Sequence, residues 1–92
     1  MTAPISDIEA EKRLTQLNNW KLYSGKLVKE YEFKDFMTAV NFVNNVAEIA
    51  EKEQHHPDII INYNKVTLEL ITHSVGGLSE NDFILAGKID KL

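Results

Sequence analysis

The sequence predicts an α+β fold, a four-stranded antiparallel sheet with helices packed on one face, in the order α-β-β-α-β-β-α. Two stretches, 20–33 and 58–73, alternate apolar and polar residues on either side of a short turn, as β-hairpins do. The stretch between them, 36–53, carries apolar residues at the three- and four-residue steps of an amphipathic helix. A chain of 92 residues with no internal linker or low-complexity segment is expected to form one domain, residues 1–92.

A short first helix is predicted at residues 7–17. Ser6 and Glu9 have the spacing of a capping box, in which a serine side chain accepts a hydrogen bond from the third helical N–H. The apolar positions of this helix are Ile8, Leu14 and Leu17. The pair Asn18-Asn19 is expected to end it.

The first hairpin is expected to turn at Ser24-Gly25, because glycine adopts the left-handed backbone of a tight turn without strain. Its apolar positions are Trp20, Leu22, Leu27, Tyr31 and Phe33. Charged residues alternate with them in the second arm, namely Lys29, Glu30 and Glu32. One face of this arm should therefore meet solvent.

The long helix at 36–53 can be capped by Asp35 and must end before Pro57, since proline disfavours helical geometry in the residue ahead of it. Its core-facing stripe is predicted to be Phe36, Ala39, Val40, Val43, Val46, Ala47 and Ala50. Phe42 and Ile49 lie partly outside that stripe, so they are either surface residues or a contact to another subunit.

The second hairpin is predicted to have strands at 59–63 and 66–71 and a turn at Asn64-Lys65. Counting outward places Tyr63 opposite Val66, Ile61 opposite Leu68, Ile59 opposite Leu70, and all six toward the core. The same register would put Pro57 opposite Thr72 and His56 opposite His73, with His55 beside them. The other face carries Ile60, Asn62, Thr67, Glu69 and Ile71, a mixed set that suits either solvent or a subunit contact.

A final helix is predicted after the loop at Gly76-Gly77. Ser79 and Asp82 have the spacing of a second capping box. The apolar positions that follow are Ile84, Leu85 and Ile89.

Composition narrows the classes of function. The formal net charge of −4 argues against a surface that binds nucleic-acid phosphates. There is no cysteine, which excludes disulfides and thiolate metal sites. The first residues lack the zones of a signal peptide and no apolar run approaches membrane-spanning length, so the cytoplasm is the expected location. A domain this small buries only somewhat more than about 60% of its unfolded surface, so self-association would help to stabilise it.

All three histidines lie between Glu51 and Asp82. His55 follows the long helix, and Glu51, one turn earlier, could hydrogen-bond its ring and fix its tautomer. Asp82 is equally well explained as a helix cap or as a site carboxylate. The cluster could hold zinc, although adjacent His55 and His56 should point to different sides of an extended segment. Alternatively, two imidazoles could transfer protons near neutral pH as acid and base.

Four motifs of the sequence resemble those of the pterin-4a-carbinolamine dehydratase family. They are Glu51-x-x-x-His55-His56-Pro57, Tyr63-Asn64-Lys65-Val66, Thr72-His73 and Gly77-Leu78-Ser79-x-x-Asp82. The resemblance implies a small α+β enzyme that dehydrates 4a-hydroxytetrahydrobiopterin to quinonoid dihydropterin, which recycles the pterin cofactor of aromatic amino acid hydroxylases. It implies no metal and no cofactor of the enzyme's own. It also implies a homodimer or homotetramer and, in animal members, a homeodomain transcription factor as partner.

By position, the resemblance assigns His55 and His73 to the acid/base pair and His56 to the same catalytic pocket. It makes Glu51, Tyr63, Thr72 and Asp82 substrate-binding or supporting residues, with Glu51 supporting His55. Gln54 and Asn81 depart from the family pattern, where some members have an acidic residue and an arginine. The alternative interpretation is an oligomeric protein-binding module that acts as the dimerisation cofactor of a transcription factor.

Overall fold

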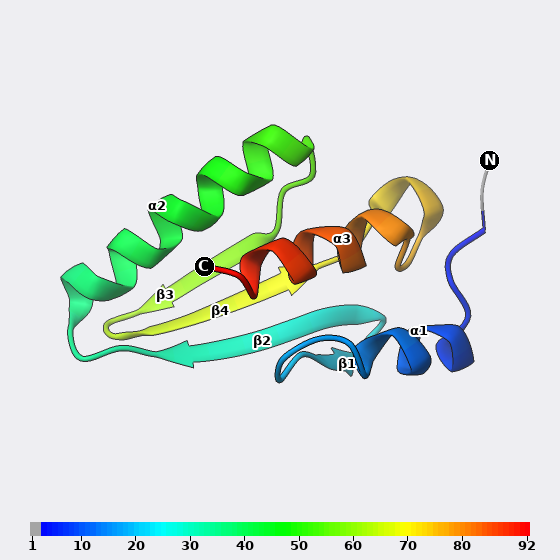
Figure 1. Cartoon of the computed structure of the whole chain (residues 1–92), viewed down its shortest axis with the longest axis horizontal. Coiled ribbons are helices and arrows are strands. Elements are labelled where there is room, and N and C mark those ends of the chain that lie inside the picture. Colours follow the sequence, from blue (N-terminus) through cyan, green and yellow to red (C-terminus); the bar gives the residue numbers. More distant parts are fainter. Residues whose placement is uncertain (1–2) are drawn as a thin grey trace.

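The computed structural model describes residues 3–92 and confirms the predicted architecture (Figure 1). Its elements are α1 Asp7–Leu14, β1 Lys21–Tyr23, β2 Lys26–Glu32, α2 Phe36–Glu53, β3 Asp58–Asn62, β4 Lys65–Leu70, the 3₁₀ helix η1 His73–Val75, and α3 Glu80–Ile89. The sheet is antiparallel throughout, in the strand order β1-β2-β4-β3. Side chains from the helices and from one face of the sheet form a single hydrophobic core. No helix among residues 3–92 is long and apolar enough to cross a membrane.

The first helix is shorter than predicted. Ser6 accepts a hydrogen bond from the Glu9 N–H at 3.2 Å, which confirms the predicted N-cap. After Leu14 the chain continues in tighter bonds between residues three apart, ending with the Leu17 N–H and the Leu14 carbonyl at 3.0 Å. Leu14 and Leu17 pack against the core as expected, but Ile8 is 73% exposed, so its predicted place on the apolar face is wrong.

The first hairpin turns where predicted. Tyr23 pairs with Lys26, and Ser24 and Gly25 between them have φ values of 50° and 76°, the left-handed pair that suits the twist of a two-residue hairpin. Lys29 does not lie on the solvent-exposed face predicted for the charged residues of β2. Its side chain is only 11% exposed and donates to Asp90 at 3.0 Å, because α3 ends over this strand.

Helix α2 has the predicted bounds, and Asp35 accepts a hydrogen bond from the Thr38 N–H at 2.8 Å. The buried stripe is rotated relative to the prediction. Phe36 is 47% exposed and Ala47 is also exposed, whereas Phe42 and Ile49 pack against the core. The aromatic rings of β2 and the segment after it draw Phe42 inward, since its ring centroid lies 4.5 Å from that of Tyr31.

The second hairpin is paired two residues away from the predicted register. Asn62 pairs with Lys65, so Tyr63 and Asn64 form the turn, and Ile59 lies opposite Leu68 instead of Leu70. A shift of two residues keeps the paired strand residues on their predicted faces. Tyr63 instead lies in the turn and is 66% exposed, and Ile61 is 40% exposed, so the prediction that these two are buried in the core is wrong. Phe33, just after β2, stabilises the turn in this register through two hydrogen bonds. The Asn64 side-chain amide donates to the Phe33 carbonyl at 2.8 Å, and the Phe33 N–H donates to the Asn64 carbonyl at 2.8 Å.

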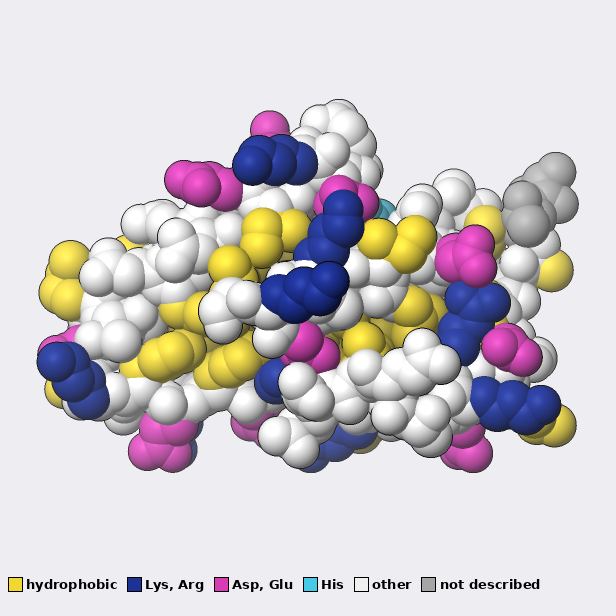
Figure 2. Space-filling model, in the orientation of Figure 1, with side chains coloured by type: hydrophobic (Ala, Val, Ile, Leu, Met, Phe, Trp, Pro, Cys, Tyr) yellow, Lys and Arg dark blue, Asp and Glu magenta, His cyan; other side chains and the backbone are white. Residues whose placement is uncertain are grey.

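Exposed hydrophobic side chains gather at the end of the molecule where α2 begins and the second hairpin turns. Figure 2 shows hydrophobic side chains at this end of the molecule, which corresponds to that end of Figure 1. The exposed residues of this region are Phe36, Met37, Ile61 and Tyr63. The helix α3 lies against α2 farther along the sheet, and an ion pair between Lys88 and Glu53 joins the two helices.

Candidate active site

The end of α2 decides where His55 and His56 go. Gln54 caps the helix in the left-handed conformation, with φ 53°, and the His55 N–H donates back to the Ala50 carbonyl at 3.2 Å. This reversal closes the helix one residue before the histidines. His55 therefore leaves the helix surface on which Glu51 lies, and the chain runs on through Pro57 into β3.

His55 forms a short hydrogen bond with Asp82 at the start of α3. The distance from His55 Nε2 to Asp82 Oδ1 is 2.5 Å, and the two side chains are 13% and 0% exposed. Among residues 3–92, Asp82 is the one charged residue that is fully buried. A buried carboxylate requires hydrogen-bond donors, so its remaining contacts matter.

Two further donors serve the other carboxylate oxygen of Asp82. The Ser79 N–H donates to Oδ2 at 2.8 Å, which is the capping contact at the N-terminus of α3, and the Thr72 hydroxyl donates to the same oxygen at 2.8 Å. Asp82 therefore does both things that the sequence left open, since it caps α3 and contacts His55. The N-terminal end of a helix also favours a negative charge.

His56 has a different partner, Glu51, which corrects the expectation that Glu51 supports His55. His56 Nε2 hydrogen-bonds Glu51 Oε2, and the side chains are 58% and 71% exposed. The reversal at Gln54 explains the exchange, because it carries His55 away from Glu51 and brings the next residue back over the last turn of α2. The site thus contains one buried histidine–carboxylate pair and one exposed pair.

His73 is the first residue of η1 and is exposed. The predicted pairing of His56 with His73 across the hairpin is wrong, because β3 begins at Asp58 and β4 ends at Leu70. The backbone of His73 is nevertheless tied to the site. Its neighbour Thr72 bonds Asp82 through the hydroxyl and bridges to Gly77 through the backbone, with the Thr72 N–H 2.8 Å from the Gly77 carbonyl.

Tyr63 does not join the histidines within one chain. It lies in the turn of the second hairpin with φ 54° and is 66% exposed. The histidines flank the opposite end of that hairpin, separated from Tyr63 by the five residues of β3, a length of about 17 Å. Ser79 also forms a hydrogen bond between its hydroxyl oxygen and that of Thr72, at 2.7 Å. Sequence reasoning missed this contact, because a capping box alone accounts for a serine at this position.

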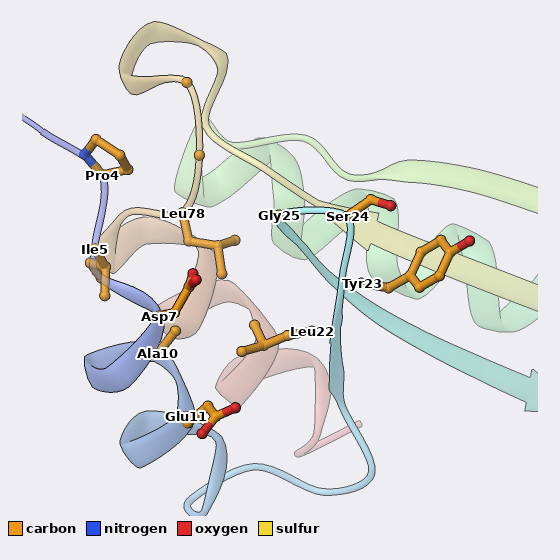
Figure 3. Close-up of a pocket in the computed structure, with 12 residues that line it drawn as sticks. Pro4, Ile5, Asp7, Ala10, Glu11, Leu22, Tyr23, Ser24, Gly25 and Leu78 are labelled. Atoms are coloured by element: carbon orange, nitrogen blue, oxygen red, sulfur yellow. The ribbon is translucent and has the colours of Figure 1, made fainter.

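Two cavities lie near the glycine loop. The cavity in Figure 3, of about 380 Å³, lies between the N-terminal segment with α1, the first hairpin turn and the loop, and no histidine lines it. A second cavity of about 470 Å³ is lined by Ala3, Ile5, Arg13, Thr72, Ser74, Val75, Ser79, Glu80 and Asn81. The second cavity therefore adjoins both the hydroxyl pair and η1. Within residues 3–92, no group of three or more histidine, aspartate or glutamate side chains is arranged to hold a metal ion.

Comparison with known sequences identifies one family. The family sequence model described as pterin 4 alpha carbinolamine dehydratase matches residues 3–92. A protein of Picosynechococcus sp. provisionally named pterin-4-alpha-carbinolamine dehydratase is 45% identical over 92 residues, which cover 100% of both chains. A protein of Acidobacterium capsulatum with the same provisional name is 52% identical over 82 residues, 89% of each chain.

Comparison with solved structures agrees. The crystal structure of a transcriptional coactivator/pterin dehydratase from Brucella melitensis superposes with a TM-score of 0.89 and 33% identity, covering 96% of each chain. A pterin dehydratase-like protein described as a RuBisCO assembly factor of the alpha-carboxysome gives a TM-score of 0.66 at 20% identity, covering 83% of this chain and 90% of the other. The latter similarity shows the fold alone.

Proposed function

Because the chain belongs to the pterin 4 alpha carbinolamine dehydratase family of hydro-lyases, we propose that it dehydrates 4a-hydroxytetrahydropterin to quinonoid dihydropterin by histidine acid–base catalysis. The observation that carries the proposal is the contact between His55 and the buried Asp82. This contact supports the proposal because it joins the His55 imidazole, which can titrate near neutral pH, to a carboxylate that can orient it. Asp82 also accepts a hydrogen bond from Thr72, the residue that precedes His73 in the sequence.

The reaction needs one acid and one base. The hydroxyl on C4a leaves as water once it receives a proton, and a ring nitrogen of the pterin releases a proton as the new double bond forms. One imidazolium and one neutral imidazole supply both transfers, and positioned acid–base groups typically contribute about 10²–10⁴-fold. His55 and His73 are proposed as this pair, and the exposed His56, which bonds Glu51, is proposed to act chiefly in substrate binding.

The biological role that follows is the recycling of the pterin cofactor of aromatic amino acid hydroxylases in the cytoplasm. The test is a stopped-flow dehydration assay on synthetic 4a-hydroxytetrahydropterin, in which absorbance follows the quinonoid product. The purified chain should accelerate product formation in proportion to its concentration. A rate equal to the spontaneous rate at every protein concentration would refute the proposed activity.

A second function, the binding of a protein partner, is favoured by one comparison and one structural observation. The Brucella melitensis protein is described as a transcriptional coactivator as well as a pterin dehydratase. In this chain, α2 begins with two exposed hydrophobic residues, Phe36 at 47% and Met37 at 61%. Residues of this kind suit a contact with another helix, either in a further copy of the chain or in a transcription factor.

A further inference from the structure

The two hydroxyl groups beside Asp82 form a continuous chain of hydrogen bonds with it. Ser79 Oγ lies 2.7 Å from Thr72 Oγ1, and Thr72 Oγ1 lies 2.8 Å from Asp82 Oδ2. On the far side of the carboxylate, Asp82 Oδ1 meets His55 Nε2. Ser79, Thr72, Asp82 and His55 are thus linked in that order, although they come from three separate parts of the chain.

The direction of each hydrogen bond follows from proton counting. A hydroxyl group has one proton to donate, and an ionised carboxylate only accepts. Thr72 therefore donates its proton to Asp82, which leaves Thr72 Oγ1 as the acceptor in its contact with Ser79. Ser79 is then the donor to Thr72. The proton of each hydroxyl points along the chain toward Asp82.

The same counting assigns the tautomer of His55. Since the carboxylate oxygen accepts, the ring nitrogen Nε2 must carry the proton in the contact with Asp82. A neutral imidazole has only one ring proton, so Nδ1 is left as the acceptor nitrogen. In this tautomer, Nδ1 is the atom of His55 that can take a proton from the substrate.

We propose that Thr72 and Ser79 are positioning residues that act through Asp82 to hold His55 in the Nε2–H tautomer, with Nδ1 as the base that removes the ring-nitrogen proton of the pterin. The proposal rests on the proposed dehydratase function and adds to it a role for each hydroxyl. The proton leaves the pterin nitrogen for Nδ1, and the electron pair of the broken N–H bond forms the new double bond as C4a loses its protonated hydroxyl as water.

The two hydroxyls differ in how closely they hold Asp82. Thr72 touches the carboxylate directly, so its loss leaves Oδ2 with the Ser79 N–H alone and the carboxylate freer to turn away from His55. The Ser79 hydroxyl hydrogen-bonds Thr72 and belongs to the capping box at the start of α3, but it makes no direct hydrogen bond to the carboxylate of Asp82. Replacing the Ser79 side chain should therefore disturb His55 in the same direction as replacing Thr72, but less.

The experiment compares Thr72→Val, Thr72→Ser and Ser79→Ala with the parent chain. Valine keeps the shape of threonine without its hydroxyl, and serine keeps the hydroxyl. Thr67→Val is the matched control, because Thr67 lies opposite Ile60 on the face of the sheet turned away from the helices. The first measurement is nitrogen-15 NMR of the histidine rings, assigned with a His55→Ala variant and recorded at a pH where the rings are neutral. The second measurement is the turnover number and KM for dehydration.

The parent should show His55 as the Nε2–H tautomer, and Thr72→Val should show a mixture of both tautomers. Turnover of Thr72→Val should fall between about tenfold and 10²-fold, the cost of a misplaced catalytic group, with little change in KM. Ser79→Ala should lie between this variant and the parent. Thr72→Ser should restore both the tautomer and the turnover, and Thr67→Val should match the parent in both.

An Nδ1–H tautomer in the parent would overturn the proposal, as would a folded Thr72→Val variant with parental tautomer and turnover. Circular dichroism establishes whether each variant is folded. If Thr72→Val unfolds, the two single variants Thr72→Ser and Ser79→Ala are compared with the parent instead. The NMR measurement needs no substrate. A parent that shows the predicted tautomers but does not dehydrate the pterin would therefore refute the base role and the dehydratase function while leaving the positioning of His55 established.

Discussion

At the scale of single residues, His55 and His73 occupy unlike surroundings. His55 is nearly buried against Asp82, whereas His73 is exposed on η1. Neither side chain belongs to the hydrophobic core, so each can be replaced without opening a cavity there. This separation between site and core makes substitution of the histidines a direct test of chemistry.

His55→Ala and His73→Ala should each lower the turnover number by roughly 10²-fold or more while the chain stays folded, because each removes a positioned acid or base. The double variant should lose less than the product of the two losses, since groups that act as one unit are not additive. His56→Ala should cost less than either, because its pair with Glu51 is exposed. Steady-state dehydration with circular dichroism measures this. Parental turnover in folded His55→Ala and His73→Ala would show the assignment to be wrong.

Activity is expected to need no metal ion. The Nε2 atoms of His55 and His56 already bond different carboxylates, those of Asp82 and Glu51, so they do not converge on one point. Dialysis against a strong chelator should leave the turnover number unchanged, with a zinc-dependent hydrolase as the positive control. Complete loss after dialysis, restored by added zinc, would contradict this expectation.

Tyr31 is a partly buried residue of β2 that packs against the core. Among residues 3–92, its hydroxyl oxygen is buried without a hydrogen-bond partner. Burial, with a smaller contribution from the negative charge of Asp90, raises the pKa of Tyr31. A raised pKa stabilises the folded chain below the unfolded value of 10.0 and loses that stabilisation as the pH rises toward the folded value.

Tyr31→Phe should therefore be at least as stable as the parent at pH 7, with a gain of up to about 1 kcal/mol from removing an unpaired hydroxyl. The variant should also lose less stability than the parent between pH 9 and pH 11. Urea unfolding at several pH values measures both effects, and Tyr23→Phe is a control because Tyr23 is 70% exposed. A variant clearly less stable than the parent at pH 7 would mean that the hydroxyl has a partner.

At the scale of elements, helix termini organise the structure. Asp35 caps α2 through the Thr38 N–H at 2.8 Å and the Thr38 hydroxyl at 2.6 Å. The hydrogen bond from the Thr38 hydroxyl contributes most, and that from the Thr38 N–H contributes less. Together they lower the pKa of Asp35 from 3.8. A lowered pKa contributes stability above the unfolded value and loses it as the pH falls through the folded value.

Asp35→Ala should lower the melting temperature at pH 7, because α2 loses its N-cap. The difference between variant and parent should shrink as the pH falls below about 3.8, where the parent's carboxylate takes up a proton. Thermal unfolding followed by circular dichroism from pH 2.5 to pH 7 measures it. A difference that is the same at every pH would show that the charge of Asp35 has no part in the cap.

At the scale of the whole molecule, hydrogen bonds join the end of α3 to the first hairpin and to the segment just before it. The carboxylate of Asp90, just after α3, accepts from the Trp20 indole N–H at 2.8 Å, the Lys29 ammonium at 3.0 Å and the Asn18 N–H at 2.9 Å. This contact joins residues about 60 to 70 positions apart in the sequence and places α3 along the sheet. The first turn of α3 is stabilised by the Asp82 carboxylate, which accepts from the Ser79 N–H. A carboxylate therefore stabilises each end of this helix.

The chain is expected to form a homodimer or homotetramer through α2 and the sheet edge. Phe42 and Ile49 pack against the core, so the exposed hydrophobic residues that suit this contact are Phe36, Met37 and Ile60. Light scattering should give a multiple of 10.5 kDa at micromolar concentration, and Met37→Glu should lower the mass. A parent mass of one chain would contradict self-association, and the control Ile8→Glu changes an exposed residue of α1 instead.

Features set by neighbouring residues were predictable from the sequence alone. The bounds of α2, the turn at Ser24-Gly25 and the caps at Ser6 and Asp35 all follow from contacts within a few positions. Such contacts are present whenever the local chain is folded, so spacing and residue type suffice to predict them. The faces of the paired strand residues in both hairpins were also predictable, because the observed shift of two residues leaves the alternation unchanged.

Contacts between residues far apart in the sequence were not predictable, because they depend on how the elements pack. The register of the second hairpin depends on Asn64 bonding Phe33, and the partner of His55 is Asp82, 27 positions later, instead of the nearby Glu51. The physical reason is the same in both cases. Several local arrangements satisfy the same hydrogen-bonding groups, and a distant element selects one of them by supplying a hydrogen-bond partner for a polar group.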